Sequence, residues 1–245
     1  MKTKALLRFL NRAARFDGDV EFVDVVAVAT KKGKLTPKSG SPLFDHLVDV
    51  KHPRLSKQTA TDHNRGLVVT HLKRTVHSAF MKDIYEDTLE YLASLLAAAA
   101  RNGLSPDRLV GDHRLSVEAN DLLRCGGWDA VVELVTRSVF RRLEDERSTK
   151  KLLEGIDAKL KLGIDKTVVA AALPFLEIRH LLVHRDGIVD ADFCRRHPTF
   201  GATNGEQIDL GHKVIDRGRT TIVALVKHYD EKAVAAKVIG SADLQ

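Results

Sequence analysis

The stretch from Leu67 to Arg101 contains neither proline nor glycine, and it constrains the fold more than any other feature of this sequence. Its apolar residues recur at helical spacing, namely Phe80, Ile84, Leu89, Leu92, Leu95 and Leu96. Asn102-Gly103 follows directly, and such a pair is typical of a helix end. Aromatic residues make up only 5% of the chain, and Ala, Leu and Val dominate its apolar set. We therefore expect an all-α fold built by helix-on-helix packing.

Further segments with the same period predict a bundle. Residues 128–160 carry apolar side chains on one side, with Gly155 as the expected break. Residues 208–238 alternate apolar and charged side chains at helical spacing. Ser105-Pro106-Asp107 has the residue order of a helix start, and residues 117–123 predict a second short helix. Together with a fourth long helix described below, these segments predict an up-down bundle.

The N-terminal residues predict a less regular extension, over residues 1–65, to a bundle over residues 66–245. Residues 4–16 have the pattern of a short amphipathic helix, which Asp17-Gly18-Asp19 is expected to end. Residues 21–28 are rich in β-branched side chains. They predict a strand, with a helix as the alternative.

Basic residues are in excess, with a formal net charge of +6 and a pI of about 9.3. Between residues 30 and 64 the chain holds three prolines and the run Lys31-Lys32-Gly33-Lys34, which predicts a loop. The charge balance suits a polyanionic partner, although many basic proteins bind none. We interpret the lysine run as a solvated loop, with an RNA-contacting arm as the alternative.

Cysteine content and hydropathy indicate an intracellular protein. Cys125 and Cys194 are too few and too far apart for a zinc cluster or a disulfide framework. The basic, amphipathic N-terminus lacks the long apolar core of a secretory signal. No continuous apolar run approaches the ~20 residues that span a bilayer. We expect a cytoplasmic location and no membrane partner.

Residues 176–190, LEIRHLLVHRDGIVD, hold the residues with the clearest chemistry. On a helical wheel with Arg179 at zero, His180 falls near ~100°, His184 near ~140° and Glu177 near ~160°. Three apolar side chains occupy the opposite sector: Ile178, Leu181 and Leu182. One face is therefore expected to be polar while the other packs inward. The helix should end at Asp186-Gly187, which places His184 in its last turn.

This motif resembles that of HEPN-domain proteins, all-helical prokaryotic ribonucleases of toxin–antitoxin, abortive-infection and CRISPR-associated systems. Arg179, the polar His180 and His184 match the family motif in order, and the turn Gly187-Ile188-Val189-Asp190 continues the match. The resemblance covers roughly residues 70–238. It implies a homodimeric, metal-independent endoribonuclease, acting as a toxin or antiphage effector and restrained by an antitoxin or another regulatory protein.

RNA cleavage without metal needs a base for the 2′-hydroxyl proton, an acid for the leaving 5′-oxygen and positive charge at the phosphate. His184 can transfer a proton at neutral pH, and Arg179 can clamp two phosphate oxygens. One chain therefore supplies half of a site, which a two-fold axis would complete. By the resemblance, His180 orients the phosphate. We expect no cofactor, no metal and products with 2′,3′-cyclic phosphate and 5′-hydroxyl ends.

Each of these residues has another interpretation. Arg179 could pair with Glu177 or with an acid on a neighbouring helix, and His184 could cap the last helical turn. His180 and His184 could share a metal, completed by Asp190 and Asp192, as the centre of a metal hydrolase. The function could also be that of a non-catalytic HEPN module that binds RNA, a nucleotide or a protein. The RNA target and any antitoxin are not determined by the sequence.

Overall fold

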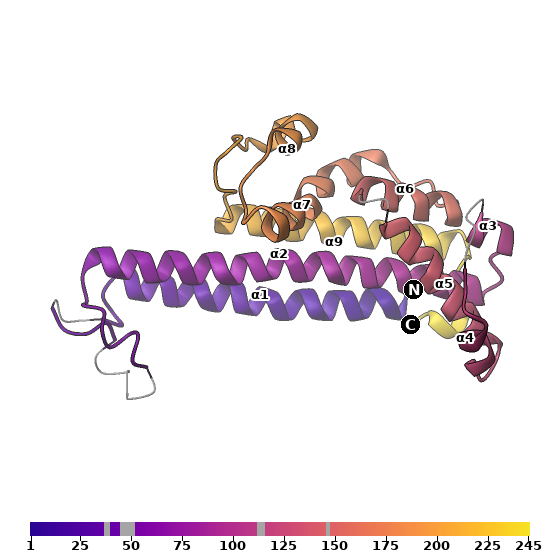
Figure 1. Cartoon of the computed structure of the whole chain (residues 1–245), viewed down its shortest axis with the longest axis horizontal. Coiled ribbons are helices and arrows are strands. Elements are labelled where there is room, and N and C mark those ends of the chain that lie inside the picture. The colour runs from indigo at the N-terminus through magenta and orange to yellow at the C-terminus, as the bar shows by residue number, and fades with distance from the viewer. Residues whose placement is uncertain (37–39, 45–51, 112–115, 146–147) are drawn as a thin grey trace. The chain divides into compact units, whose positions relative to one another are not determined.

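A computed structural model describes residues 1–36, 40–44, 52–111, 116–145 and 148–245. Helices make up 71% of the chain, and no strand occurs in the described residues, so the prediction of an all-α protein is confirmed. The more specific up-down, HEPN-like bundle stays a prediction. The helices are labelled in Figure 1: α1 (Lys4–Lys31), α2 (Asp62–Arg101), α3 (Pro106–Val110), α4 (Ala119–Arg124), α5 (Trp128–Glu144), α6 (Thr149–Leu160), α7 (Lys166–His184), α8 (Ala191–Arg196), η1 (Pro198–Phe200), α9 (His212–Ala235) and η2 (Ser241–Asp243).

The chain divides into two compact units. The main unit consists of Met1–Ala13 and Met81–Gln245, and the hairpin unit consists of Ala14–Phe80. The sequence predicted one boundary, after residue 65, between an N-terminal extension and a bundle. The two compact units are divided at other positions. The division into extension and bundle stays a prediction.

The N-terminal segment is one continuous helix, α1, so both the predicted end at Asp17-Gly18-Asp19 and the predicted strand over residues 21–28 are wrong. The reason lies in the spacing of its buried residues within the hairpin unit. Val20, Val23, Ala27 and Thr30 are buried and lie three or four positions apart, which is the period of a helix. Gly18 is tolerated on an open face, since a Cβ there would meet nothing within 4 Å.

The segment predicted as one helix over residues 128–160 is two helices, α5 and α6. α5 ends at Glu144 and α6 begins at Thr149, where the Ser148 side chain accepts a hydrogen bond from the Lys151 amide and caps α6. Gly155, the expected break, lies inside α6 instead. A Cβ at Gly155 would lie 3.0 Å from Leu143 Cδ2, so this glycine allows α6 to approach α5 closely.

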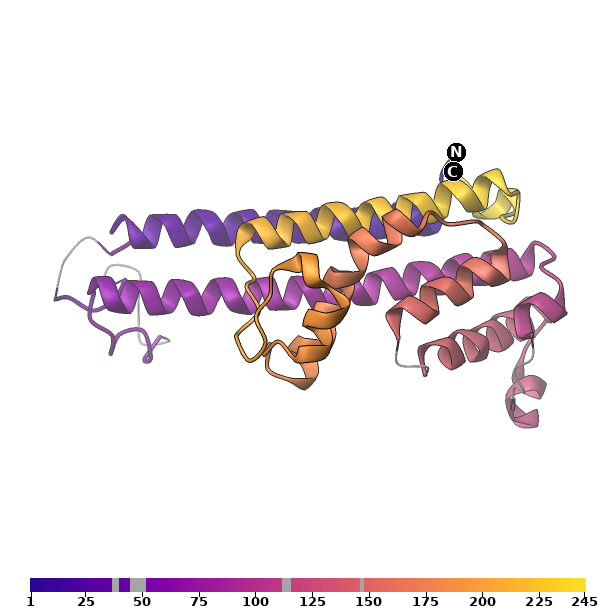
Figure 2. The same cartoon turned by 90° about the horizontal axis from the view of Figure 1, so that it is seen from above.

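The core of the main unit is formed where α7 packs on α9, with α6 packed on α7 and α5 (Figures 1 and 2). Gly218 of α9 permits the close approach, because a Cβ there would lie only 2.9 Å from Phe175 Cδ1. The predicted helix start at Ser105-Pro106-Asp107 is confirmed, since Ser105 caps α3.

The two chain ends lie together in the main unit (Figures 1 and 2). Lys2 and Gln245 exchange backbone hydrogen bonds of 3.1 and 2.9 Å. The buried carboxylate of Asp230 in α9 accepts hydrogen bonds from the Thr3 amide and hydroxyl. These contacts fix the start of α1 against the main unit.

Among the described residues, α7 is the one helix long and apolar enough to pass a membrane-span test, with a mean hydropathy of 1.3. The sequence had predicted that no apolar run is long enough to span a membrane. Its buried face packs on α9, and core helices of soluble proteins pass the same test.

Candidate functional site

The predicted end of α7 is confirmed. At its start, Asp165 Oδ1 accepts a hydrogen bond of 2.8 Å from the Thr167 amide. At its end, the Gly187 amide reaches back to the Leu181 carbonyl at 2.9 Å, with Gly187 in the left-handed region at φ +79°. Asp186 also takes a left-handed φ, of 51°, so two successive left-handed residues end the helix. His184 accordingly occupies the last turn.

The inner face of α7 is largely as predicted. Ile178 and Leu181 are fully buried, and Leu182 is half-buried. Pro174 lies inside the helix, one position before the buried Phe175. The apolar face therefore fixes the rotation of α7 and with it the direction of the motif side chains.

Arg179 pairs with an acid on a neighbouring helix, which was one of its two alternative interpretations. Its Nη2 lies 3.2 Å from Glu86 Oε1 of α2, and its guanidinium carbon lies 5.1 Å from the centroid of the Tyr85 ring. The Arg179 side chain remains 33% exposed and that of Glu86 55% exposed. Burial and the nearby Glu86 carboxylate raise the pKa of Glu144, while Arg179 opposes this shift. The guanidinium therefore lies among acidic groups.

His180 and His184 form an exposed pair at the end of α7. Their ring centroids are 4.8 Å apart, with the ring planes tilted by 48°. Partial burial lowers the pKa of His180, and the adjacent His184 lowers it further. His180 is therefore mostly neutral at neutral pH and can accept a proton or a hydrogen bond.

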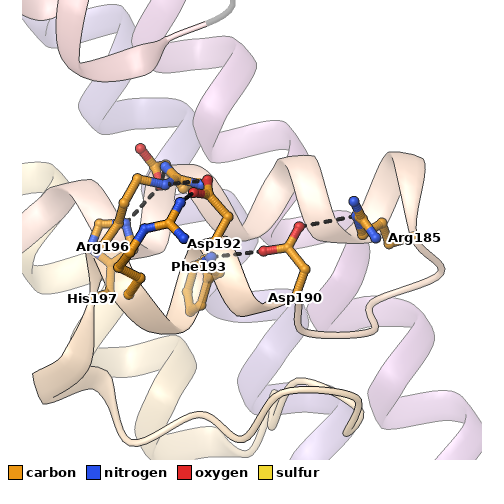
Figure 3. Close-up of polar contacts among 8 residues, drawn as sticks. Arg185, Asp190, Asp192, Phe193, Arg196 and His197 are labelled. Carbon is orange, nitrogen blue, oxygen red and sulfur yellow. Dashed lines mark hydrogen bonds and ion pairs between the residues drawn. The ribbon is translucent and has the colours of Figure 1, made fainter.

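Glu177 does not lie on the exposed polar face, and the expectation that it would is wrong. Its side chain is 9% exposed and is held by two residues at the end of α8. Arg196 forms an ion pair with Glu177 Oε2, and His197 Nε2 lies 2.7 Å from the same oxygen (Figure 3). His197 is itself buried.

The polar contacts of α8 hold the chain that follows the histidine pair (Figure 3). Asp190 Oδ1 caps α8 by accepting a 2.7 Å hydrogen bond from the Phe193 amide. Its other oxygen lies 3.0 Å from Arg185 Nε, directly after His184. Arg196 Nε also lies 2.8 Å from Asp192 Oδ2. Sequence analysis missed these partners, although an aspartate directly before a short helix is a recognisable cap.

The structure brings the two histidines together but does not join them to Arg179. Among the described residues, no hydrogen bond or ion pair links Arg179 to His180 or His184. Likewise, no group of three or more His, Cys, Asp or Glu in the described chain is placed to hold a metal ion. Asp190 and Asp192, which the metal interpretation required, are instead paired with arginines.

No protein-family model, no curated protein and no solved structure matches this chain. The resemblance to HEPN domains therefore depends on the sequence motif of residues 176–190 and stays a prediction.

Proposed function

We propose that this protein is a metal-independent endoribonuclease that completes its site by pairing two copies. The observation that carries the proposal is the exposed histidine pair at the end of α7, one turn from a partly exposed arginine. Imidazoles and a guanidinium can supply the base, the acid and the positive charge that 2′-hydroxyl attack requires. Their exposure leaves them open to a substrate and to a second copy.

In the proposed reaction, a general base removes the 2′-hydroxyl proton, and the 2′-oxygen attacks phosphorus. The bond to the 5′-oxygen breaks as a general acid protonates that oxygen, which gives a 2′,3′-cyclic phosphate and a 5′-hydroxyl. His184 of one copy acts as base and His184 of the other as acid. Arg179 binds the phosphoryl oxygens. His180, kept neutral by its lowered pKa, orients the phosphate by hydrogen bonding.

Exposed apolar side chains support pairing at this end of α7. Val183 is 44% exposed and Ile188 39% exposed, and they lie on either side of His184 in the sequence. Large apolar side chains on a surface are often covered at an interface. A two-fold axis through this region would bury both and bring two histidine pairs toward one phosphate.

A second candidate is a non-catalytic module that binds RNA, a nucleotide or a protein. The pairing of Arg179 with Glu86 and its stacking on Tyr85 favour it, because both contacts engage the guanidinium that catalysis would use.

An RNA-cleavage assay in EDTA separates the two. We expect wild-type protein to cut, and Arg179→Ala and His184→Ala to fold but lose about 10²- to 10⁴-fold in rate. His212→Ala is the matched control, since His212 is an exposed histidine at a helix end. Equal cleavage by all four proteins indicates a contaminating nuclease and refutes the proposal.

Mixing wild type with an excess of His184→Ala tests the shared site. If the base and the acid come from different copies, a heterodimer keeps only one His184 and cannot complete the reaction. The mixture should therefore cut more slowly than the same amount of wild type alone. A rate unchanged by the excess, despite exchange of copies measured by sedimentation of labelled protein, would show that the site is not shared.

The toxin or antiphage role has its own readout in cells. Expression of wild type should arrest growth, while expression of either variant should not. Release from arrest by a co-expressed neighbouring gene would identify the proposed antitoxin or regulatory protein.

A further inference from the structure

The arginines around the end of α7 are already engaged. Arg179 pairs with Glu86, Arg185 with Asp190, Arg195 with Asp192 and Arg196 with Glu177. Each cation thus has an acidic partner in the described chain. Non-specific affinity for nucleic acid comes from cations that neutralise phosphates. The candidate site therefore has little free positive charge with which to hold a strand.

Free positive charge gathers in the part of the hairpin unit that follows residue 24, since its other described acids, Asp17, Asp19, Glu21 and Asp24, come before it. Between residues 25 and 80, the described part of the chain holds eight Lys or Arg and one acid, Asp62. Five of these cations are exposed and form no ion pair with a described residue: Lys31, Lys32, Lys34, Arg54 and Lys57. We call these five residues the basic end of the hairpin unit. They belong to the end of α1 and to the loop that connects it to α2 (Figure 1).

The lysine run is held in an ordered turn. α1 ends with the Lys34 amide bonded to the Ala29 carbonyl at 2.9 Å, and Gly33 takes the left-handed φ of +68°. This is a Schellman-type helix end, in which the amide after a left-handed glycine bonds to a carbonyl five positions back. The three lysines therefore project from a turn of fixed backbone, which lowers the conformational entropy lost when they bind a ligand.

The second part of the connection is fastened to the first. The Leu43 amide bonds to the Gln58 carbonyl, and the Ala60 amide bonds to the Ser41 carbonyl at 2.7 Å. Leu43 and Ala60 are buried. Arg65 of α2 donates to the Thr36 hydroxyl at 3.1 Å, which ties the loop to the start of α2. Arg54 and Lys57 are thereby held at the same end of the unit as the lysine run.

We infer that the basic end of the hairpin unit is a contact surface for the sugar-phosphate backbone of single-stranded RNA. The inference rests on the proposed nuclease function, for which it supplies the substrate affinity that the engaged arginines of α7 and α8 do not. Neutralised phosphates release counterions, so binding here depends steeply on salt. The inference takes up the RNA-contacting arm, which was the alternative to a solvated loop for the lysine run.

The test measures RNA binding separately from cleavage. Full-length His184→Ala protein binds a labelled single-stranded RNA of about 20 nucleotides in fluorescence anisotropy between 50 and 300 mM salt. One variant carries Gln at all five positions of the basic end. Its matched control carries Gln at five exposed lysines of the main unit: Lys161, Lys166, Lys213, Lys227 and Lys237. Both variants change the net charge equally.

Five lost phosphate contacts should reduce the slope of log K against log salt by about 3.5, at ~0.7 per contact for a single strand. We expect the basic-end variant to approach this reduction and to lose at least about tenfold in affinity at 100 mM salt. The control variant should keep most of the salt dependence and most of the affinity of the parent protein. Equal losses in the two variants, with unchanged melting temperatures, overturn the inference, because net charge alone would then explain binding.

Two further arms complete the test. Vesicles containing phosphatidylserine test whether the basic end binds an anionic membrane surface instead. If the basic-end variant loses binding to vesicles but not to RNA, the inference is overturned. Cleavage by the nuclease is scored independently. If wild type cuts no RNA but RNA binding depends on the basic end, the proposed function fails while the inference stands.

Discussion

Replacing Glu177 with alanine tests whether the buried ion cluster holds α8 against α7. The change removes the partner of His197, whose side chain is only 6% exposed. A buried polar group left without its partner costs about 1–3 kcal/mol. Arg196 is 42% exposed and can turn into water, so its share is below about 1 kcal/mol. We expect a loss of about 3 kcal/mol in the free energy of unfolding.

For a chain of this length, that loss corresponds to a fall of about 6–12 °C in Tm, at ~2–4 °C per kcal/mol. Thermal unfolding followed by circular dichroism at pH 7.5 measures it. Glu177→Gln keeps an acceptor for His197 and should lose about a third as much. Asp192→Ala is the matched control, because Asp192 pairs with Arg196 on the surface of the same helix.

The reasoning predicts an order of stability as well as a size. Asp192→Ala should stay within about 1 kcal/mol of wild type, as surface ion pairs do. A Tm for Glu177→Ala no lower than that of Asp192→Ala would refute the claim that burial makes this carboxylate structurally important.

Three further outcomes follow from the same contacts. Glu86→Gln should raise cleavage of limiting RNA by up to about fivefold by releasing Arg179, since a surface pair is worth up to ~1 kcal/mol, and cleavage rates check it. His180→Gln should reduce the loss of Tm between pH 7.5 and 5.5: the folded-state pKa of His180 lies below its ordinary value of 6.5, so falling pH favours the unfolded chain in wild type. Gly218→Ala should lower Tm, because its Cβ would lie 2.9 Å from Phe175 Cδ1 and overpacking by ~1–3 kcal/mol exceeds the ~1 kcal/mol gain in helix propensity. A rise in Tm would show that the Phe175 ring moves aside.

Features set by neighbours in the chain were predictable. The end of α7 just before Gly187 and the start of α3 after Ser105 depend on the conformational freedom of glycine and on side-chain capping, both of which act between close neighbours in the chain. Residues 21–28 show the opposite case. β-branched side chains favoured a strand locally, but the spacing of buried positions set by packing within the hairpin unit made the segment helical.

The surroundings of the motif residues were not predictable, because their partners come from distant segments. Arg179 meets Glu86, 93 positions earlier in the chain, and Glu177 meets His197, 20 positions later. A helical wheel gives the direction of a side chain and says nothing of what lies opposite. The wheel placed Glu177 beside His184, and only the position of α8 explains why this carboxylate is buried.

The pairing of Arg179 with Glu86 is compatible with phosphate binding by the proposed nuclease. With one side chain 33% exposed and the other 55% exposed, the pair is worth up to about 1 kcal/mol. Hydrogen bonds from a guanidinium to a phosphate are worth about 1.5–3 kcal/mol each, and two can form at once. A phosphate held close to α7 can therefore displace Glu86. The Tyr85 ring would still support the flat face of the guanidinium, because stacking leaves its edge donors free. In the proposed nuclease, Glu86 thus keeps Arg179 positioned until RNA arrives, and substrate affinity must come from elsewhere in the chain.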